Sequence, residues 1–284
     1  MSDSAPTPFG RFRALAGWIL LPLIAGILLS LLIPKPTIGV IYLKDAIYDG
    51  SAQDMITQLI YAREHPEVRA VVLVVNSPGG TVTDTESVYL EMARLRQTKP
   101  VVMMVEGMAA SGAYYLAAGS DYVLAKPSSL VGNIGIIGYL PESPNVQEEV
   151  YSTGPYKTLG YPRDTFIRDM DTLKQGFLKA VQIGRGDRLK IGPEVILRGE
   201  IWAGTTALKY GLIDAIGTQS QAFDQAAAMA HIAHYTTADL RALSGLPDLA
   251  VSPFFYQAPD GRMTPYPNQS GLFYLYVPPT EEQP

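Results

Sequence analysis

The chain contains no cysteine and only three histidines among its 284 residues. The absence of cysteine excludes disulfide bonds, thiolate catalysis and cysteine-based zinc sites, although it leaves the cellular compartment open. The histidines are His65, His231 and His234. The last two lie three residues apart without a third ligand nearby in sequence, so we expect a surface helix there rather than a metal site. We expect no metal and no cofactor.

Charged residues are also scarce, at 17% of the chain against 47% hydrophobic residues. This composition suits a packed core together with one apolar segment, and it argues against disorder. The net charge of −5 provides no general attraction to nucleic acid. We therefore expect no nucleic-acid partner.

One segment, Ala14 to Ile33, has no charged residue over 20 positions. A helix of that length spans about 30 Å, the thickness of the hydrocarbon core of a membrane. The segment ends in Leu-Leu-Ile-Pro-Lys-Pro, without the small-residue cleavage site of a signal peptide. We expect an uncleaved transmembrane anchor over residues 14–33, preceded by a cytoplasmic amino terminus over residues 1–13.

The charges that flank this segment leave its orientation undecided. Arg11 and Arg13 precede it, and Lys35 and Lys44 follow it, so the positive-inside rule gives two against two. Because the arginines precede the first helix and a long domain follows, we favour a single-pass membrane protein. Its folded domain then lies on the extracytoplasmic side.

The remaining chain alternates between strand and helix patterns. Short continuous apolar runs at residues 69–76 and 100–106 are typical of buried parallel strands. Further patterns predict strands at 37–43, 122–125 and 134–139 and helices at 54–64, 81–96, 113–119 and 163–190. No internal repeat is visible. The sequence predicts one α/β domain with a mainly parallel sheet and flanking helices over residues 37–235.

The composition changes near the carboxyl terminus. Residues 253–284 contain seven prolines and seven aromatic residues, a composition typical of extended chain. We assign residues 236–284 to a Pro- and aromatic-rich tail. Two interpretations stay open, a mobile tail and a segment whose aromatic residues dock on a neighbouring surface.

Two glycine-rich turns follow two of the expected strands, at Asn76–Gly80 and Gly107–Gly112. In a parallel sheet both turns lie at the carboxyl ends of strands, where ligands bind. Glycine lets the backbone approach a ligand, and free amides at helix starts face negative charge. Either turn alone is a weak signal. Together, with Ser111 at the tip of the second, they have the pattern of a nucleophile beside an oxyanion hole.

Several blocks of the sequence resemble the signal peptide peptidase A (SppA) family of serine proteases, over roughly residues 38–233. The blocks are Asn76–Gly80, Gly107–Tyr115, Leu130–Gly135, Trp202–Gly204 and Ala207–Asp214. The resemblance implies the Clp-protease/crotonase fold, with one such unit in this chain and assembly into a homo-oligomeric ring. It also implies peptide substrates at the membrane, either released signal peptides or other apolar segments.

The same resemblance assigns the catalytic residues. Clp proteases place a histidine about 25 residues after the serine, but this chain has none between His65 and His231. The SppA pattern Ser/Thr-Gly-x-Tyr-Lys matches Thr153–Lys157, which makes Lys157 the general base and Ser111 the nucleophile. The backbone amides of Gly80 and Gly112 then form the oxyanion hole.

A lysine base has to meet a physical condition. The free side chain has a pKa of about 10.4, so Lys157 is protonated at neutral pH unless burial lowers that value. A lowering of about 3 units costs about 4 kcal/mol of folding free energy, and stability then rises with pH between the two pKa values. We expect Lys157 to be buried and neutral, and Lys157→Met to abolish activity without destabilising the domain.

One block departs from the family pattern. Asn133 stands where SppA proteins commonly have a serine that orients the lysine, and Val131 replaces a threonine. The side-chain oxygen of Asn133 is able to accept the same hydrogen bond.

Three other functions compete with a signal peptide peptidase. The first is an inactive membrane scaffold of the same fold, which the presence of both Ser111 and Lys157 disfavours. The second is a crotonase-type acyl-CoA enzyme, but such enzymes normally use acidic residues and the Ser111 turn has none. The third is a protease that cleaves one membrane protein partner, and the sequence separates this alternative only weakly.

Overall fold

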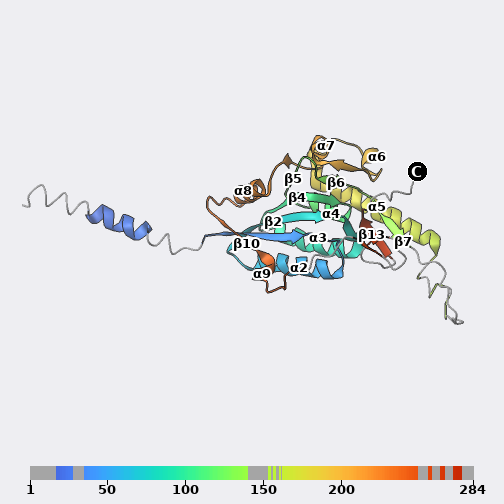
Figure 1. Cartoon of the computed structure of the whole chain (residues 1–284), viewed down its shortest axis with the longest axis horizontal. Helices are drawn as coiled ribbons and strands as arrows, with labels where there is room; N and C mark the ends of the chain where they lie inside the picture. Colours follow the sequence, from blue (N-terminus) through green and yellow to red (C-terminus); the bar gives the residue numbers. More distant parts are fainter. Residues whose placement is uncertain are drawn as a thin grey trace, which may run out of the picture.

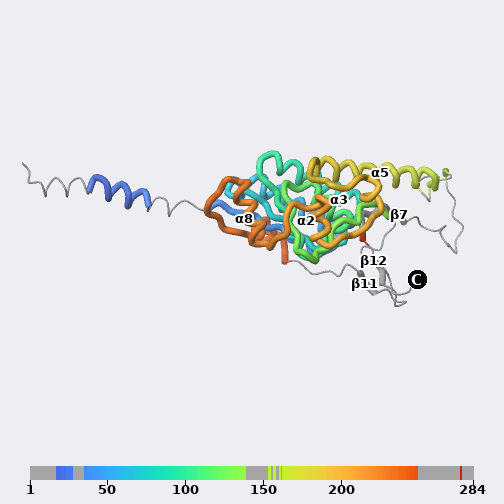
Figure 2. The backbone as a smooth tube through the Cα atoms, turned by 90° about the horizontal axis from the view of Figure 1, so that it is seen from above, coloured from blue at the N-terminus to red at the C-terminus, as the bar shows by residue number. Residues whose placement is uncertain are grey.

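A computed structural model describes residues 17–27, 35–139, 153–154, 156–157, 160, 162–248, 255–257, 263–265 and 271–276 (Figures 1 and 2). Residues 17–27 are helical, and the rest of the expected anchor lies outside these ranges. Within them, no helix combines the length and the apolar character needed to cross a bilayer. The transmembrane anchor over residues 14–33 thus stays a prediction.

Eight strands form one mostly parallel sheet in the order β10-β1-β2-β4-β5-β9, with β6 paired to β4 and β8 paired antiparallel to β6. The prediction of an α/β fold with a mainly parallel sheet is confirmed. The strands are β1 (Thr37–Leu43), β2 (Val68–Ser77), β4 (Val101–Ala110), β5 (Tyr122–Ala125), β6 (Leu130–Gly132), β8 (Ile201–Ala203), β9 (Ala215–Ile216) and β10 (Thr236–Asp239).

Helices cover both faces of this sheet (Figure 1). The larger core cluster packs α2, α3, α4 and α5 on one face, and α8 packs on the other. The helices are α2 (Asp49–Glu64), α3 (Val82–Arg96), α4 (Gly112–Ala118), α5 (Arg163–Arg185), α6 (Pro193–Ile196), α7 (Gly204–Lys209), α8 (Gln219–Met229) and α9 (Leu240–Leu243), with a 3-10 turn, η1, at Gly186–Arg188.

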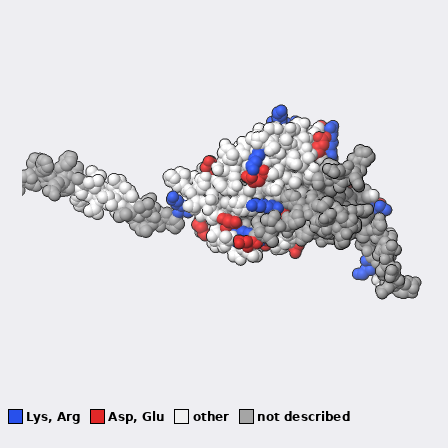
Figure 3. Space-filling model, viewed as in Figure 1, with Lys and Arg blue, Asp and Glu red and all other residues white. Residues whose placement is uncertain are grey.

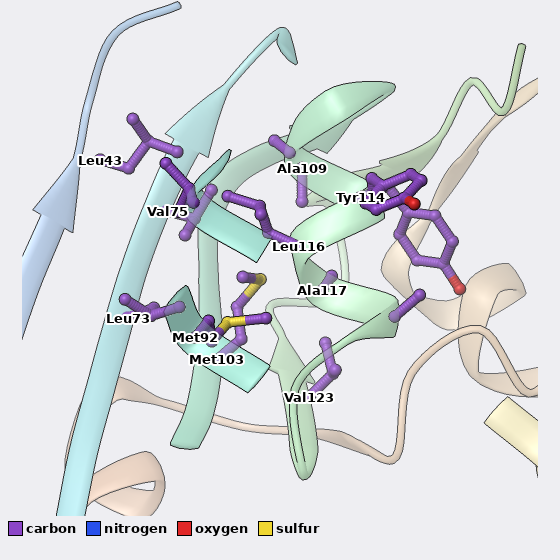
Figure 4. Packing of buried hydrophobic residues seen from close by; sticks show 14 of the residues in the cluster. Leu43, Leu73, Val75, Met92, Met103, Ala109, Tyr114, Leu116, Ala117 and Val123 are labelled. Carbon is purple, nitrogen blue, oxygen red and sulfur yellow. The ribbon is translucent and has the colours of Figure 1, made fainter. Parts of the chain in front are cut away.

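The central strands are buried on both faces, which explains their continuous apolar runs. Leu73 and Val75 of β2 point into the larger cluster with Met103 of β4 (Figure 4). Val72 and Val74, on the alternate positions of β2, point into the cluster that includes α8. Each such side chain contributes roughly 1.5–3 kcal/mol relative to an exposed one. These two strands are therefore the rigid centre on which the neighbouring turns are built.

Several element boundaries differ from the sequence prediction, and two of these differences extend the predicted structure. β4 continues to Ala110, four residues past the expected end, because its last residues pair with β2 and β6. The body also extends beyond residue 235, since β10 pairs in parallel with β1 and Leu240 is fully buried. Only tertiary pairing reveals these extensions, because neither segment has a strong hydrophobic pattern.

Two small sheets complete the described structure. One pairs β11 (Phe255–Gln257) with β12 (Met263–Pro265). The other has the order β3-β13-β7, where β3 is Gly79–Thr81, β7 is Ile137–Tyr139 and β13 is Gly271–Leu275. The expected tail thus contributes a strand that lies against the body. On the face shown in Figure 3, acidic and basic side chains are interspersed over the described surface.

A buried ion pair joins α5 to the sheet. Arg185 donates to both carboxylate oxygens of Asp214, at 2.8 and 2.9 Å, and their side chains are 0% and 6% exposed. Arg188 and the backbone amide of Val123 also donate to this carboxylate. Burial by itself raises the pKa of Asp214, but the hydrogen bonds and charge of Arg185 outweigh it and leave the pKa below its usual range.

Replacing Asp214 tests this pair. Asp214→Asn leaves the Arg185 charge buried without its partner, so we expect the free energy of unfolding at pH 7 to fall by about 3–5 kcal/mol in urea titrations. The matched control is Asp164→Asn, which removes an exposed pair with Arg168 and should leave the free energy of unfolding close to that of the wild type. Equal losses in the two variants would contradict a structural role for Asp214.

The same pair predicts a pH dependence. Because the folded-state pKa of Asp214 is depressed, its contribution is fully present above the unfolded value of about 4 and is lost as pH falls through the folded value. Unfolding free energies measured from pH 7 down to pH 2 should therefore decline less steeply in Asp214→Asn than in the wild-type chain.

Candidate active site

The two glycine-rich turns lie side by side at the carboxyl edge of the sheet. β2 and β4 pair in parallel, with Ser77 opposite Ala109, so both strands end at the same level. β3 follows β2 after one residue, and α4 follows β4 after Ser111. The parallel register therefore brings together the two turns that the sequence analysis singled out.

Ser111 occupies a strained position between β4 and α4. Its backbone has φ 53° and ψ −117°, which for a residue other than glycine costs about 1–3 kcal/mol. The strain is held by the β4–β6 pairing, which ends in a hydrogen bond of 2.8 Å from the Ser111 amide to the Gly132 carbonyl. The residue is 2% exposed, and no group within the described ranges forms a hydrogen bond with its Oγ.

Gly80 is required by a close backbone contact. The Ile47 amide donates to Gly79 O at 2.8 Å, and the Thr81 amide donates to Ile47 O at 2.9 Å. A Cβ on Gly80 would lie 1.8 Å from Ile47 O, so no side chain fits. Ile47 thus bonds to the carbonyl of Gly79 and the amide of Thr81, and the amide of Gly80 points away from Ile47. No motif in the sequence marks Ile47 as part of the site.

Gly112, the second expected amide donor, is the first residue of α4. The first amides of a helix have no partner within the helix, so they are available to an oxyanion. Gly80 and Gly112 thus flank the turn of Ser111 from two adjacent strand ends. This is the arrangement that the sequence predicted, and their role as oxyanion-hole donors stays a prediction.

The Asn133 turn is clamped to a neighbouring loop. Asn133 has φ 53°; its amide donates to Glu200 O, and its side-chain Nδ2 donates to Gly199 O, both at 2.7 Å. Among the described residues no donor reaches its Oδ1, which leaves this oxygen as an acceptor. The turn directly follows Gly132, whose carbonyl holds the Ser111 amide, so Asn133 lies next to the serine in the fold.

Lys157 does not meet the condition that the sequence analysis set for it. It lies in a turn, with its amide bonded to Gly154 O at 3.1 Å, and its side chain is exposed. The expected burial among apolar groups is therefore wrong for the single chain. The described contacts do not join Lys157 to Ser111 or Asn133. Most of residues 140–161 lies outside the described ranges.

All three histidines lie at the opposite edge of the sheet from Ser111. His65 precedes the amino end of β2, where its carbonyl accepts the Val68 amide. His231 and His234 precede β10, whose first residue pairs with the first residue of β1. Strands rise about 3.3 Å per residue, so a ten-residue strand separates the two edges by about 30 Å. No histidine is positioned to act as the base for Ser111.

The two tyrosines that follow Ser111 on α4 are also unsuited to act as a base. Burial raises the pKa of Tyr115 to about 12, with Glu86 adding to the effect, and this keeps its phenol neutral. Tyr114 is fully buried, its pKa is raised further, and its hydroxyl donates to Leu212 O at 2.9 Å. Within the described residues no cluster of acidic residues and histidines is able to hold a metal ion.

Comparison with known proteins places this site in a family. The model for Peptidase family S49 matches residues 93–233, and the Clp protease model matches residues 37–130. Protease 4 of Salmonella typhi is 32% identical over 69% of this chain and 35% of its own length. Protease 4 of Haemophilus influenzae is 29% identical over 66% of this chain and 34% of its own length.

A chloroplastic serine protease SPPA of Arabidopsis thaliana is 28% identical over 64% of this chain and 29% of its own length. The chain thus spans about a third of the length of these relatives. The two matching models together cover residues 37–233, which include the strand ends, the Ser111 turn and the Asn133 turn. The chain belongs to peptidase family S49, the family of the signal peptide peptidase A proteins.

Proposed function

We propose that this protein is a membrane-anchored serine endopeptidase in which Ser111 is the nucleophile and Lys157 the general base. The observation that carries the proposal is the strained backbone of Ser111 beside Gly80 at the carboxyl edge of the sheet. Membership in a peptidase family supports it. The position of every histidine at the opposite edge favours a base other than imidazole.

The proposed reaction is acyl transfer. Ser111 Oγ attacks a peptide carbonyl carbon while Lys157 Nζ accepts the hydroxyl proton. The backbone amides of Gly80 and Gly112 stabilise the negative charge on the carbonyl oxygen. The C–N bond then breaks, and Lys157 returns its proton to the leaving amine. A water molecule deprotonated by Lys157 finally attacks the ester and releases a carboxylate.

This mechanism requires Lys157 to leave the exposed position it has in the single chain. A lysine side chain is uncharged at neutral pH only in an apolar environment, and approach of the neutral amine to Asn133 Oδ1 would supply an orienting hydrogen bond. Such cover comes from movement of the segment that holds Lys157 or from a second copy of the chain in a homo-oligomeric ring. We propose the ring as the active form.

The membrane location rests on the amino-terminal helix. Residues 17–27 expose large apolar side chains, with Trp18 at 82% and Leu21 at 71%, and they lie inside the 20-residue uncharged segment. Apolar surface of this extent suits a lipid environment. The proposed protein is single-pass with its catalytic domain on the extracytoplasmic side, and its substrates are released signal peptides or other apolar segments near the bilayer.

A fluorophosphonate probe tests the nucleophile. We expect the full chain in detergent to become labelled at Ser111, because the probe phosphonylates an activated serine. Labelling should disappear in Ser111→Ala and persist in Ser87→Ala, which removes an exposed hydroxyl on α3. Mass spectrometry of the labelled peptide identifies the modified residue. An unlabelled wild-type chain would favour the inactive scaffold.

Replacement of the lysine tests the base. Lys157→Met should lower kcat for peptide hydrolysis by about 10²–10⁴-fold, the range for loss of a general base. Its thermal unfolding midpoint should match that of the wild type, because the side chain is exposed. Lys174→Met is the matched control on α5, where the side chain pairs with Asp171, and it should keep full activity. Undiminished hydrolysis by Lys157→Met would eliminate it as the base.

A comparison of peptides tests the substrate class. The full chain in detergent micelles should cleave synthetic signal peptides in preference to charged peptides of equal length, because the anchor places the site near apolar substrates. Cut positions are read by mass spectrometry, and Ser111→Ala is the control for contaminating activity. Equal rates for both peptide sets would argue against signal peptides as the preferred substrates.

A further inference from the structure

The strand β13 pairs with β3 and contacts α4, the two elements in which the glycine-rich turns end. We propose that β13 occupies the substrate-binding position of the protease and competes there with incoming peptides. The occupant is the chain's own segment, Gly271–Leu275, followed by Tyr276. This inference rests on the proposed function, because the competition has a consequence only if the site binds peptides.

β13 joins two strand edges that belong to the candidate site. It pairs antiparallel with β3, with Tyr274 opposite Gly80, and antiparallel with β7, with Phe273 opposite Ile137. It also contacts α4, the helix that begins after Ser111. Figure 1 shows β13 beside β7, at the carboxyl edge of the sheet. Strand edges of this kind bind extended peptides through main-chain hydrogen bonds.

The register places one carbonyl of β13 at the proposed oxyanion hole. The Tyr276 amide donates to Pro78 O at 2.7 Å, which makes these two residues a hydrogen-bonding pair. Such pairs recur at every second residue of an antiparallel ladder, so the next one is Tyr274 with Gly80. The Gly80 amide therefore faces the Tyr274 carbonyl, and Ile47 does not compete for it.

β13 thus has the register of a substrate whose scissile carbonyl is that of Tyr274. The contacts that define this register are main-chain ones, and any extended peptide is able to form them. The described body ends at residue 248 and β13 begins at residue 271, so the strand is tethered by the intervening segment. Because β13 belongs to the same chain as the site, its binding is intramolecular, and dissolved peptides have to compete with its effective concentration.

Hydrogen exchange at single amides tests the occupancy without requiring catalysis. In Ser111→Ala, the Gly80 amide should be protected by β13. Adding Tyr276→Pro removes the amide that donates to Pro78, and exchange at Gly80 should then accelerate by about tenfold or more, as expected if β13 occupies the site in about nine-tenths or more of the molecules before the change and releases it afterwards.

Two internal controls accompany that measurement. Tyr276→Ala keeps the backbone amide and should leave Gly80 protected. The Thr81 amide, which donates to Ile47 O, should stay protected in every variant. A Gly80 amide that exchanges freely in Ser111→Ala, or that is indifferent to Tyr276→Pro, would overturn the proposal.

Kinetics then test the competition. With Ser111 intact, Tyr276→Pro should lower KM for a peptide substrate by about tenfold and leave kcat unchanged, because more of the enzyme is free to bind. Tyr276→Ala should behave like the wild type. An unchanged KM in Tyr276→Pro would contradict competition. A chain that neither hydrolyses peptides nor reacts with a fluorophosphonate fails as a protease, and the exchange measurement still decides where β13 lies.

Discussion

The parallel pairing of β2 with β4 is the interaction on which the site depends. It sets Ser77 opposite Ala109, so two turns that are about 30 residues apart in sequence emerge at the same edge. Both strands are buried on both faces, and their hydrophobic packing resists any change of register. The packing energy of the core therefore offsets the unfavourable backbone conformation of Ser111. An isolated turn would not keep this conformation.

The nucleophile and its proposed base differ sharply in how firmly the fold holds them. Ser111 is fixed by β4, β6 and α4, and Asn133 is clamped by the loop at Gly199 and Glu200. Lys157 lies in an exposed turn. In the proposed mechanism the nucleophile and the oxyanion hole are preformed, and activity depends on the burial of Lys157. Assembly of several chains is one physical means to do so.

β13 also limits the access of peptides to the site. A tethered strand that pairs with β3 and β7 protects two open edges from pairing with other chains, and it keeps the Gly80 amide occupied. Its main-chain pairing also indicates how a substrate lies, as an extended strand antiparallel to β3. The same geometry thus describes both how peptides bind and what they have to displace.

The sequence by itself determined the α/β fold, the strand-end position of both turns and the choice of Ser111. These features follow from local signals: apolar runs of strand length, glycines at turns, and motif blocks whose residues are close in sequence. The length of the uncharged amino-terminal segment is a local signal too. Such local signals can be interpreted without knowing which distant residues pack beside them.

Only the tertiary structure decided the rest. The contact of Ile47 with Gly80, the continuation of the body through β10, and the hold of Gly199 on Asn133 join segments that are distant in sequence and lack motifs. The exposure of Lys157 is of the same kind, because burial depends on which distant surface comes to lie over a side chain. β13 docks through backbone groups, which every residue has, so no pattern of side chains predicts this contact.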